Sequence, residues 1–262
     1  MTFSIITIFP EIFDSYFNES IIKRARKKNL IDVKIHNLRN FTTDKHKTVD
    51  DTPYGGGAGM VLKIEPIYKA LCALKKQKTK NKKQINSKIV LLSARGKKWN
   101  QRLAKKYSKL DEIVFICGRY EGVDERVKKL INEEISIGDY VLTGGELGAM
   151  IIVDSVARLL PGVLGNTQSA INESHAEPGI LEHPQYTRPE VFEMSGKKQR
   201  VPKILLSGDH QKITDWRKKK MRQSGHNHLF RVWLYLLFLL TLPQSGSFCF
   251  ITLGPLFVMS QL

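Results

Sequence analysis

Short apolar runs that lack polar alternation constrain the fold of this chain most. Such runs are typical of strands with both faces buried, and helical segments are expected between them. The expected strands cover residues 3–8, 33–38, 89–92 and 113–116. The expected helices cover residues 20–28, 65–76, 98–107 and 147–160. Strands that alternate with helices predict an α/β fold with a mostly parallel sheet, in which ligands bind beyond the carboxyl ends of the strands.

The chain is strongly basic. Its 262 residues include 42 Lys and Arg against 25 Asp and Glu, which gives a formal net charge of +17. A protein with this charge is expected to meet a polyanion, because phosphate contacts give affinity that does not depend on sequence. The lysine run at residues 75–83 is typical of a solvated loop. A surface that faces phosphate is better predicted at Arg217, Lys218, Lys219, Lys220 and Arg222.

Several classes of protein are excluded by the motifs that the chain lacks. It has no GxxxxGK[ST] sequence, and its GGGAGM run (Gly55–Met60) is not GxGxxG, so neither an NTPase nor a dinucleotide oxidoreductase is expected. Three isolated cysteines indicate a reducing compartment, so a cytoplasmic location is expected. No histidine pattern indicates a metal site. The apolar N-terminus lacks a basic first segment and is interpreted as a buried strand.

Glycine-rich blocks between Cys117 and Gly148 predict a pocket built from loops. The blocks are GRYEGVDER (118–126) and SIGDYVLTGGEL (136–147), and an earlier block reads TVDDTPYGGGAGM (48–60). Together they resemble the bacterial tRNA (guanine-N1)-methyltransferases that modify guanine 37, which are knotted methyltransferases of the SPOUT class. The resemblance implies S-adenosylmethionine as methyl donor, a trefoil knot formed by the pocket loops, and a homodimer with its active site between the subunits. It also implies a small helical C-terminal domain that grips the anticodon arm of tRNA.

The resemblance also assigns residues to the pocket for the methyl donor. These residues are Leu91, Leu92, Ser93, Gly118, Tyr120, Glu121, Ile137, Gly138, Asp139, Tyr140, Val141, Leu142, Gly144 and Gly145. From the residues alone, the glycines could equally serve only tight turns. No membrane partner is expected, and a magnesium requirement stays open.

Methylation of guanine N1 requires a base for the N1 proton and a cation for the charge that develops on O6. By resemblance the cation is Arg158, in the sequence DSVARLLPG; the alternative is a solvated cation at a helix end. The family places an aspartate as base before serine and phenylalanine, whereas this chain reads SAINESH. Glu173 therefore takes the position of the base, with a side chain longer by one methylene, and we expect activity to be retained but slower. His175 replaces the aromatic residue.

Changes of composition divide the chain into four segments. The predicted divisions are a methyltransferase domain at 1–161, a linker at 162–184, a truncated tRNA-binding domain at 185–228 with a helix over 211–222, and an atypical apolar tail at 229–262. The apolar runs of the tail are shorter than a membrane-spanning helix requires. The tail suggests a frameshift or a foreign fusion, with a weak membrane anchor as the alternative.

Three other functions remain open from the sequence. One is a different knotted RNA methyltransferase, for example one that acts on ribose. Another is a catalytically impaired RNA-binding homologue, which the change to Glu173 and the unusual tail would favour. A membrane-tethered protein that uses the tail is the third.

Overall fold

A computed structural model describes residues 1–79, 85–165 and 173–223 of the chain. The polypeptide divides into two compact units, Met1–Pro178 and Gly179–Leu262. The proposed tail at 229–262 lies outside the described residues, as does much of the lysine run at 75–83.

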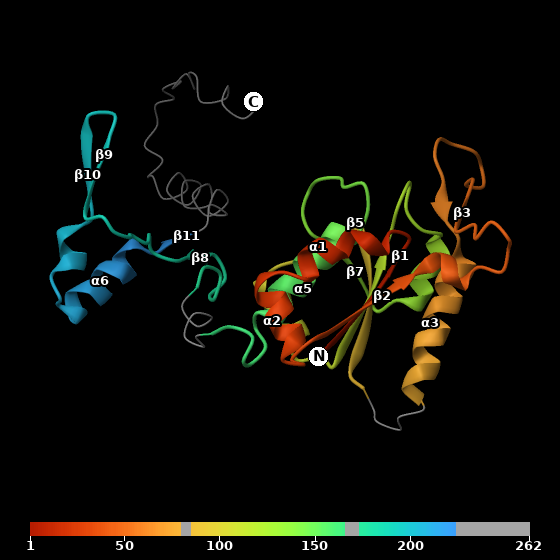
Figure 1. The fold of residues 1–262 in the computed structure, drawn as a ribbon. Helices are drawn as coiled ribbons and strands as arrows, with labels where there is room; N and C mark the ends of the chain where they lie inside the picture. Colours follow the sequence, from red (N-terminus) through yellow and green to blue (C-terminus); the bar gives the residue numbers. More distant parts are fainter. Residues whose placement is uncertain (80–84, 166–172, 224–262) are drawn as a thin grey trace, which may run out of the picture. The chain divides into compact units, whose positions relative to one another are not determined.

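The first unit is built on a five-stranded sheet in which every pairing is parallel, so the predicted α/β class is confirmed. The strand order is β2-β1-β6-β5-β7 (Figure 1). The strands are β1 (Thr2–Thr7), β2 (Asp32–Asn37), β5 (Ser87–Lys98), β6 (Glu112–Cys117) and β7 (Glu133–Ser136). Because all five run the same way, their carboxyl ends gather at one edge, where ligands bind in open α/β sheets.

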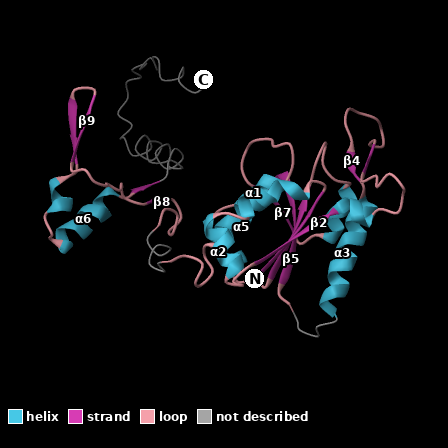
Figure 2. Ribbon diagram, viewed as in Figure 1, coloured by secondary structure: helices cyan, strands magenta, loops and turns pink. Residues whose placement is uncertain are grey.

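Helices cover both faces of the sheet (Figure 2). One face carries η1 (Pro10–Phe13), α1 (Asp14–Phe17), α2 (Ser20–Lys27), α4 (Gln101–Tyr107) and α5 (Glu146–Ala157). The other face carries η2 (Leu38–Phe41), α3 (Ile64–Thr79), η3 (Glu125–Leu130) and the short strands β3 (Asp50–Asp51) and β4 (Val61–Leu62).

Side chains along the central strands point alternately to the two faces of the sheet, so the core consists of two clusters. Phe3 and Phe115 point toward α1, α2, α4 and α5, whereas Ile6 and Ile116 point toward α3. All four of these side chains are at most 1% exposed. Strands buried on both faces are continuous in apolar residues, which is why these runs could be recognised in the sequence.

Several elements of the first unit differ from the predictions, and the largest differences concern β5, α4 and β7. Strand β5 does not stop at Leu92 but continues to Lys98 after a register shift, and its far end pairs with β7. The helix expected from Lys98 therefore begins at Gln101, where the Asn100 side chain accepts a hydrogen bond from Leu103 N at 3.0 Å. Strand β7 was not predicted, because Ile135 is the only apolar residue among its four.

The described part of the second unit combines one helix with small antiparallel sheets. Its elements are β8 (Ile180–Leu181), β9 (Val191–Met194), β10 (Lys197–Arg200), η5 (Lys203–Leu206), α6 (His210–Lys220) and β11 (Arg222–Gln223). Asp209 caps α6 by accepting from Lys212 N at 3.0 Å, and Trp216 of α6 packs against Tyr186. The helix ends two residues before the predicted Arg222, and the β9–β10 hairpin was not predicted.

Candidate active site

A cavity of about 480 Å³ lies beside the register shift of β5 and beyond the carboxyl ends of β6 and β7. Its walls include residues 91–95 of β5 and the loops that begin at Gly118 and Ile137. The volume falls in the range of small-molecule sites, roughly 300–1,000 Å³. The sheet topology thus assembles loops that are up to about fifty residues apart in sequence into one pocket.

Thirteen of the fourteen residues expected at the donor pocket line this cavity. The exception is Asp139, whose exposed carboxylate pairs instead with Lys98 at the end of β5. Binding of a donor by the thirteen, which the resemblance assigned, stays a prediction. That the loops gather at one edge was expected from the parallel sheet.

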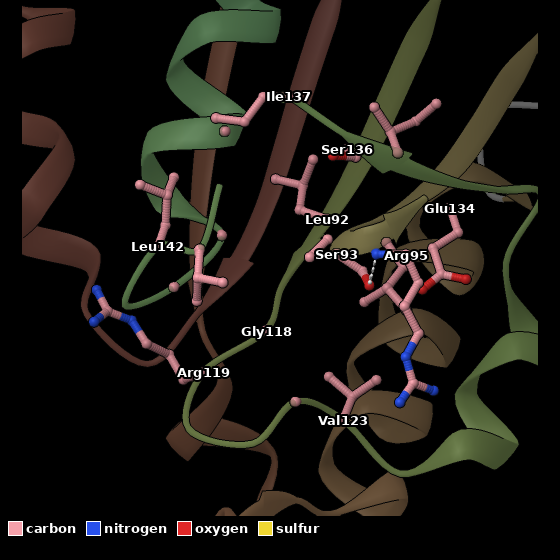
Figure 3. Close-up of a pocket in the computed structure, with 18 of the residues that line it drawn as sticks. Leu92, Ser93, Arg95, Gly118, Arg119, Val123, Glu134, Ser136, Ile137 and Leu142 are labelled. Atoms are coloured by element: carbon pink, nitrogen blue, oxygen red, sulfur yellow. Dashed lines mark hydrogen bonds between the residues drawn. The ribbon is translucent and has the colours of Figure 1, made fainter. Parts of the chain in front are cut away.

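The two sides of the cavity differ in character (Figure 3). Leu92, Ile137 and Leu142 surround an apolar side, while Arg95 and Glu134 approach from the other side. Glycines between the side chains leave backbone amides and carbonyls accessible. Such a pocket suits a ligand with an apolar or aromatic portion and a zwitterionic portion.

Several lining residues were missed by the sequence analysis. They are Ala94, Arg95, Arg119, Gly122, Val123, Glu125, Lys128, Glu134, Ile135, Ser136, Thr143 and Gly148. Arg95 and Arg119 could have been found, because each lies within three residues of a predicted strand end. Glu134 and Ile135 could not, because strand β7 itself was not recognised.

A second cluster contains the two predicted catalytic residues. Arg158 Nη2 lies 2.5 Å from Glu173 Oε2, and Gln101 Nε2 donates to Glu173 Oε1 at 3.0 Å. The hydrogen bond to Glu173 raises the pKa of Arg158 above its ordinary value, so the guanidinium stays charged. The structure therefore joins Arg158 with Glu173 and adds Gln101, which was not predicted.

The neighbouring acid Asp154 lies one helical turn before Arg158. It interacts with Tyr16 of α1, and burial together with this hydrogen bond raises the pKa of Tyr16 to about 12. This contact gives Asp154 a structural role as a partner on the side of the helix.

The pocket and the Arg158 cluster lie at opposite ends of α5. Gly148 of the first turn lines the cavity, whereas Arg158 caps the carboxyl end. Ten residues at 1.5 Å each separate the two positions by about 15 Å along the axis. Within one chain Glu173, which pairs with Arg158, is not among the residues that line the pocket.

Within the described residues no group of three or more His, Cys, Asp or Glu side chains is arranged to hold a metal ion. The same residues contain no helix that is both long and apolar enough to cross a bilayer.

A parallel α/β sheet with a pocket at its carboxyl edge is the architecture of α/β proteins that bind small molecules there. Comparison with known proteins gives the family. Residues 1–233 match the family model described as tRNA (Guanine-1)-methyltransferase TrmD. The chain belongs to this family, so the resemblance stated from its glycine blocks is confirmed.

Curated relatives support the same assignment. A tRNA (guanine-N(1)-)-methyltransferase of Dictyoglomus turgidum is 56% identical over 216 residues, covering 82% of this chain and 83% of the relative. Its counterpart in Carboxydothermus hydrogenoformans is 52% identical over 232 residues (88% and 85%). That of Enterococcus faecalis is 47% identical over 220 residues (84% and 86%).

Proposed function

We propose that this protein transfers a methyl group from S-adenosylmethionine to N1 of guanine 37 in tRNA. The observation that supports it most is the glycine-lined pocket at the carboxyl edge of the sheet, in a chain whose family is known. The isolated cysteines fit a cytoplasmic location, and the basic charge fits a tRNA substrate.

The residues of the pocket fit the methyl donor. The adenine ring suits the apolar side near Leu92, Ile137 and Leu142, and backbone groups of the glycine loops can read its edge. The charged amino-acid portion suits the side lined by Arg95, Glu121 and Glu134. When bound, the donor supplies a methyl group on an already reactive sulfonium, so the protein needs no covalent intermediate.

Glu173 and Arg158 supply the proton transfer and the charge stabilisation. Glu173 accepts the N1 proton, which contributes roughly 10²–10⁴-fold to the rate. Arg158 leaves the carboxylate to donate to O6, where negative charge develops as N1 loses its proton. In the resting structure the ion pair holds the two side chains together.

Recognition of guanine 37 fits an exposed base in the anticodon loop. A single-stranded loop allows the base to be flipped out and read on its edge. The cluster Arg217, Lys218, Lys219 and Lys220 on the last turn of α6 offers cations to phosphates, which position the RNA without reading its sequence.

We further propose that two copies of the chain complete the active site. An apolar face supports this arrangement, with Phe9, Ile12 and Tyr16 on and before η1 and α1, and Leu147 and Ile151 on α5; each is 41–52% exposed. Burial of this face against a second copy would bring Glu173 of one chain to the pocket of the other. The 15 Å gap within one chain is then bridged between chains.

Subunit complementation tests this arrangement. Glu173→Gln removes the base, and Leu142→Trp fills the pocket; each homodimer is expected to be inactive. Mixed dimers unite an intact pocket with an intact base, so refolding the two together should restore roughly a quarter of the wild-type rate. No recovery despite proven subunit exchange would place the site within one chain.

The pocket loops are proposed to form the trefoil knot of the family. Two features support it: the register shift of β5 after Leu92 and the renewed pairing of Lys97 with Ile135. Gly96 lies so close to β7 that an added Cβ would be 2.5 Å from the Ile135 carbonyl carbon.

Nucleoside analysis tests the proposed reaction against the alternatives. A tRNA transcript with guanine 37 is incubated with the protein and the donor. The RNA is then digested, and the nucleosides are identified by mass spectrometry. We expect 1-methylguanosine. A 2′-O-methylated nucleoside would instead indicate a ribose methyltransferase, and donor binding without any product would indicate a catalytically impaired RNA-binding protein.

A further inference from the structure

A buried ion pair lies beside the pocket, formed by Arg119 and Glu146. Arg119 Nε donates to Glu146 Oε2 at 2.9 Å, and the two side chains are 14% and 1% exposed. Glu146 is the first residue of α5, where the positive end of the helix favours a carboxylate. Arg119 lines the cavity and Glu146 does not. Glu146 can therefore influence a ligand only through its neighbours.

The second carboxylate oxygen of Glu146 fixes the pair to the sheet. Thr7 Oγ1, at the carboxyl end of β1, donates to Glu146 Oε1 at 2.7 Å. The same hydroxyl oxygen accepts from Phe9 N at 3.0 Å. Both carboxylate oxygens are thus bonded, as a charge withdrawn from water requires.

Arg119 connects the two glycine loops of the pocket. Its Nη1 donates to the Thr143 carbonyl at 3.3 Å, and its backbone forms an isolated bridge with Gly144. Gly145 N donates to the Gly118 carbonyl at 2.9 Å. A side chain at position 144 would overlap Arg119 Nε, so the close approach needs glycine there.

The guanidinium is also covered by an aromatic ring. Its central carbon lies 4.7 Å from the centroid of Phe9. Such a contact further limits the orientations open to Arg119.

We propose that Glu146 is a positioning residue for the methyl donor, acting through Arg119. The inference rests on the proposed function. The pair holds loop 118–122 and loop 143–145 at one spacing, anchored to β1 by Thr7, so that the loops are preorganised for the donor. Without the carboxylate of Glu146, Arg119 loses its fixed orientation. Binding of the donor must then also order the two loops, which lowers the affinity for the donor.

Isothermal titration of S-adenosylmethionine into the full chain tests the proposal. For Glu146→Gln we expect the dissociation constant and the KM for the donor to rise about tenfold, with kcat at saturating donor within about threefold of wild type. Arg119→Lys keeps the charge but cannot bond both Glu146 and Thr143. Its dissociation constant for the donor should therefore lie between those of wild type and Arg119→Met. The double variant Glu146→Gln/Arg119→Met should bind no more weakly than Arg119→Met, because the two residues act as one unit.

Two further variants keep the test decisive. Thr7→Val removes the anchor to β1 together with the hydrogen bond from Phe9 N, and it should shift the dissociation constant in the same direction, which provides a readout if Glu146→Gln does not fold. Arg126→Met breaks the pair of exposed Arg126 with half-buried Asp124, two residues that do not line the cavity, and should leave donor binding unchanged.

The outcomes separate this inference from the proposed function. If wild type binds the donor and the Glu146 and Thr7 variants bind equally well while only their melting temperatures fall, the pair is merely structural and the inference is wrong. If wild type itself does not bind the donor, the proposed function fails as well.

Discussion

Arg158 Nη2 and Glu173 Oε2 lie 2.5 Å apart, so the proposed cation and the proposed base neutralise each other in the resting protein. The carboxylate is only 13% exposed on its side chain, and its other oxygen is occupied by Gln101. A guanine that enters between them would separate the pair, with O6 taking the guanidinium and N1–H taking the carboxylate. The pair thus holds the proposed cation and the proposed base side by side before guanine binds.

Removal of the base should abolish the chemical step without affecting the pocket. Glu173→Gln keeps the shape and the acceptor oxygen but cannot take a proton, so kcat should fall by at least about 10²-fold. Donor binding should be unchanged, because Glu173 lies outside the cavity. Single-turnover kinetics and calorimetry measure the two quantities. The matched control is Glu177→Gln, an exposed acid in the same segment, and equal turnover in Glu173→Gln and wild type would exclude Glu173 as the base.

Gln101 should matter as a positioning residue for Glu173. Gln101→Ala removes a hydrogen bond to a charged group, a change of about 1.5–3 kcal/mol, so kcat should fall roughly tenfold or more with donor affinity intact. Gln101→Glu places a second carboxylate beside the first, which raises the pKa of the pair. Its pH–rate profile should therefore move to higher pH. An unmoved profile together with a wild-type rate in Gln101→Ala would contradict this role.

The close contact between Gly96 and β7 predicts a position that tolerates no side chain. In Gly96→Ala the new Cβ would lie 2.5 Å from the Ile135 carbonyl carbon, a backbone atom that cannot turn aside. Overpacking of this kind costs about 1–3 kcal/mol or more. Thermal unfolding should show a lower midpoint. Gly165→Ala, where an added Cβ meets nothing within 4 Å, is the control and should unfold as wild type does.

Cys117 should be unreactive in the folded protein. Burial raises the pKa of its thiol well above the ordinary value, and the Glu146 carboxylate adds to the effect. The thiolate is the nucleophile, so alkylation by iodoacetamide at about pH 8 should spare Cys117 until the chain unfolds. Half-buried Cys72 should react faster. Peptide mass spectrometry measures the alkylation rate of each cysteine. Equal rates for the two in the folded protein would show that the carboxyl end of β6 opens readily.

The central strands could be predicted because strands that are buried on both faces consist of consecutive apolar residues. Residues 113–116 are apolar since both faces of β6 are covered, and no other element fits so short a run. Strand β7 could not be predicted, because Glu133 and Glu134 are polar and its place depends on pairing with a distant strand. Glu133 bonds to the Tyr107 hydroxyl, and Glu134 reaches the pocket; both contacts exist only in the folded chain.

The pocket was predictable as a set of loops, but its side chains were not. Glycines at 118, 138, 144 and 145 indicate where the backbone turns. The partnership of Arg119 with Glu146 joins residues from the two ends of the glycine-rich stretch, and no spacing rule foretells it. Gln101 was likewise hidden, since its contact with Glu173 spans 72 residues of sequence.

Methyl transfer from labelled S-adenosylmethionine tests the proposed reaction most directly. Two tRNA transcripts are compared, one with guanine at positions 36 and 37 and one with guanine 37 replaced. We expect label only in the first, at a rate that falls with Glu173→Gln. Equal labelling of both transcripts, or none in either while donor binding remains, would contradict methylation of guanine 37 by this protein.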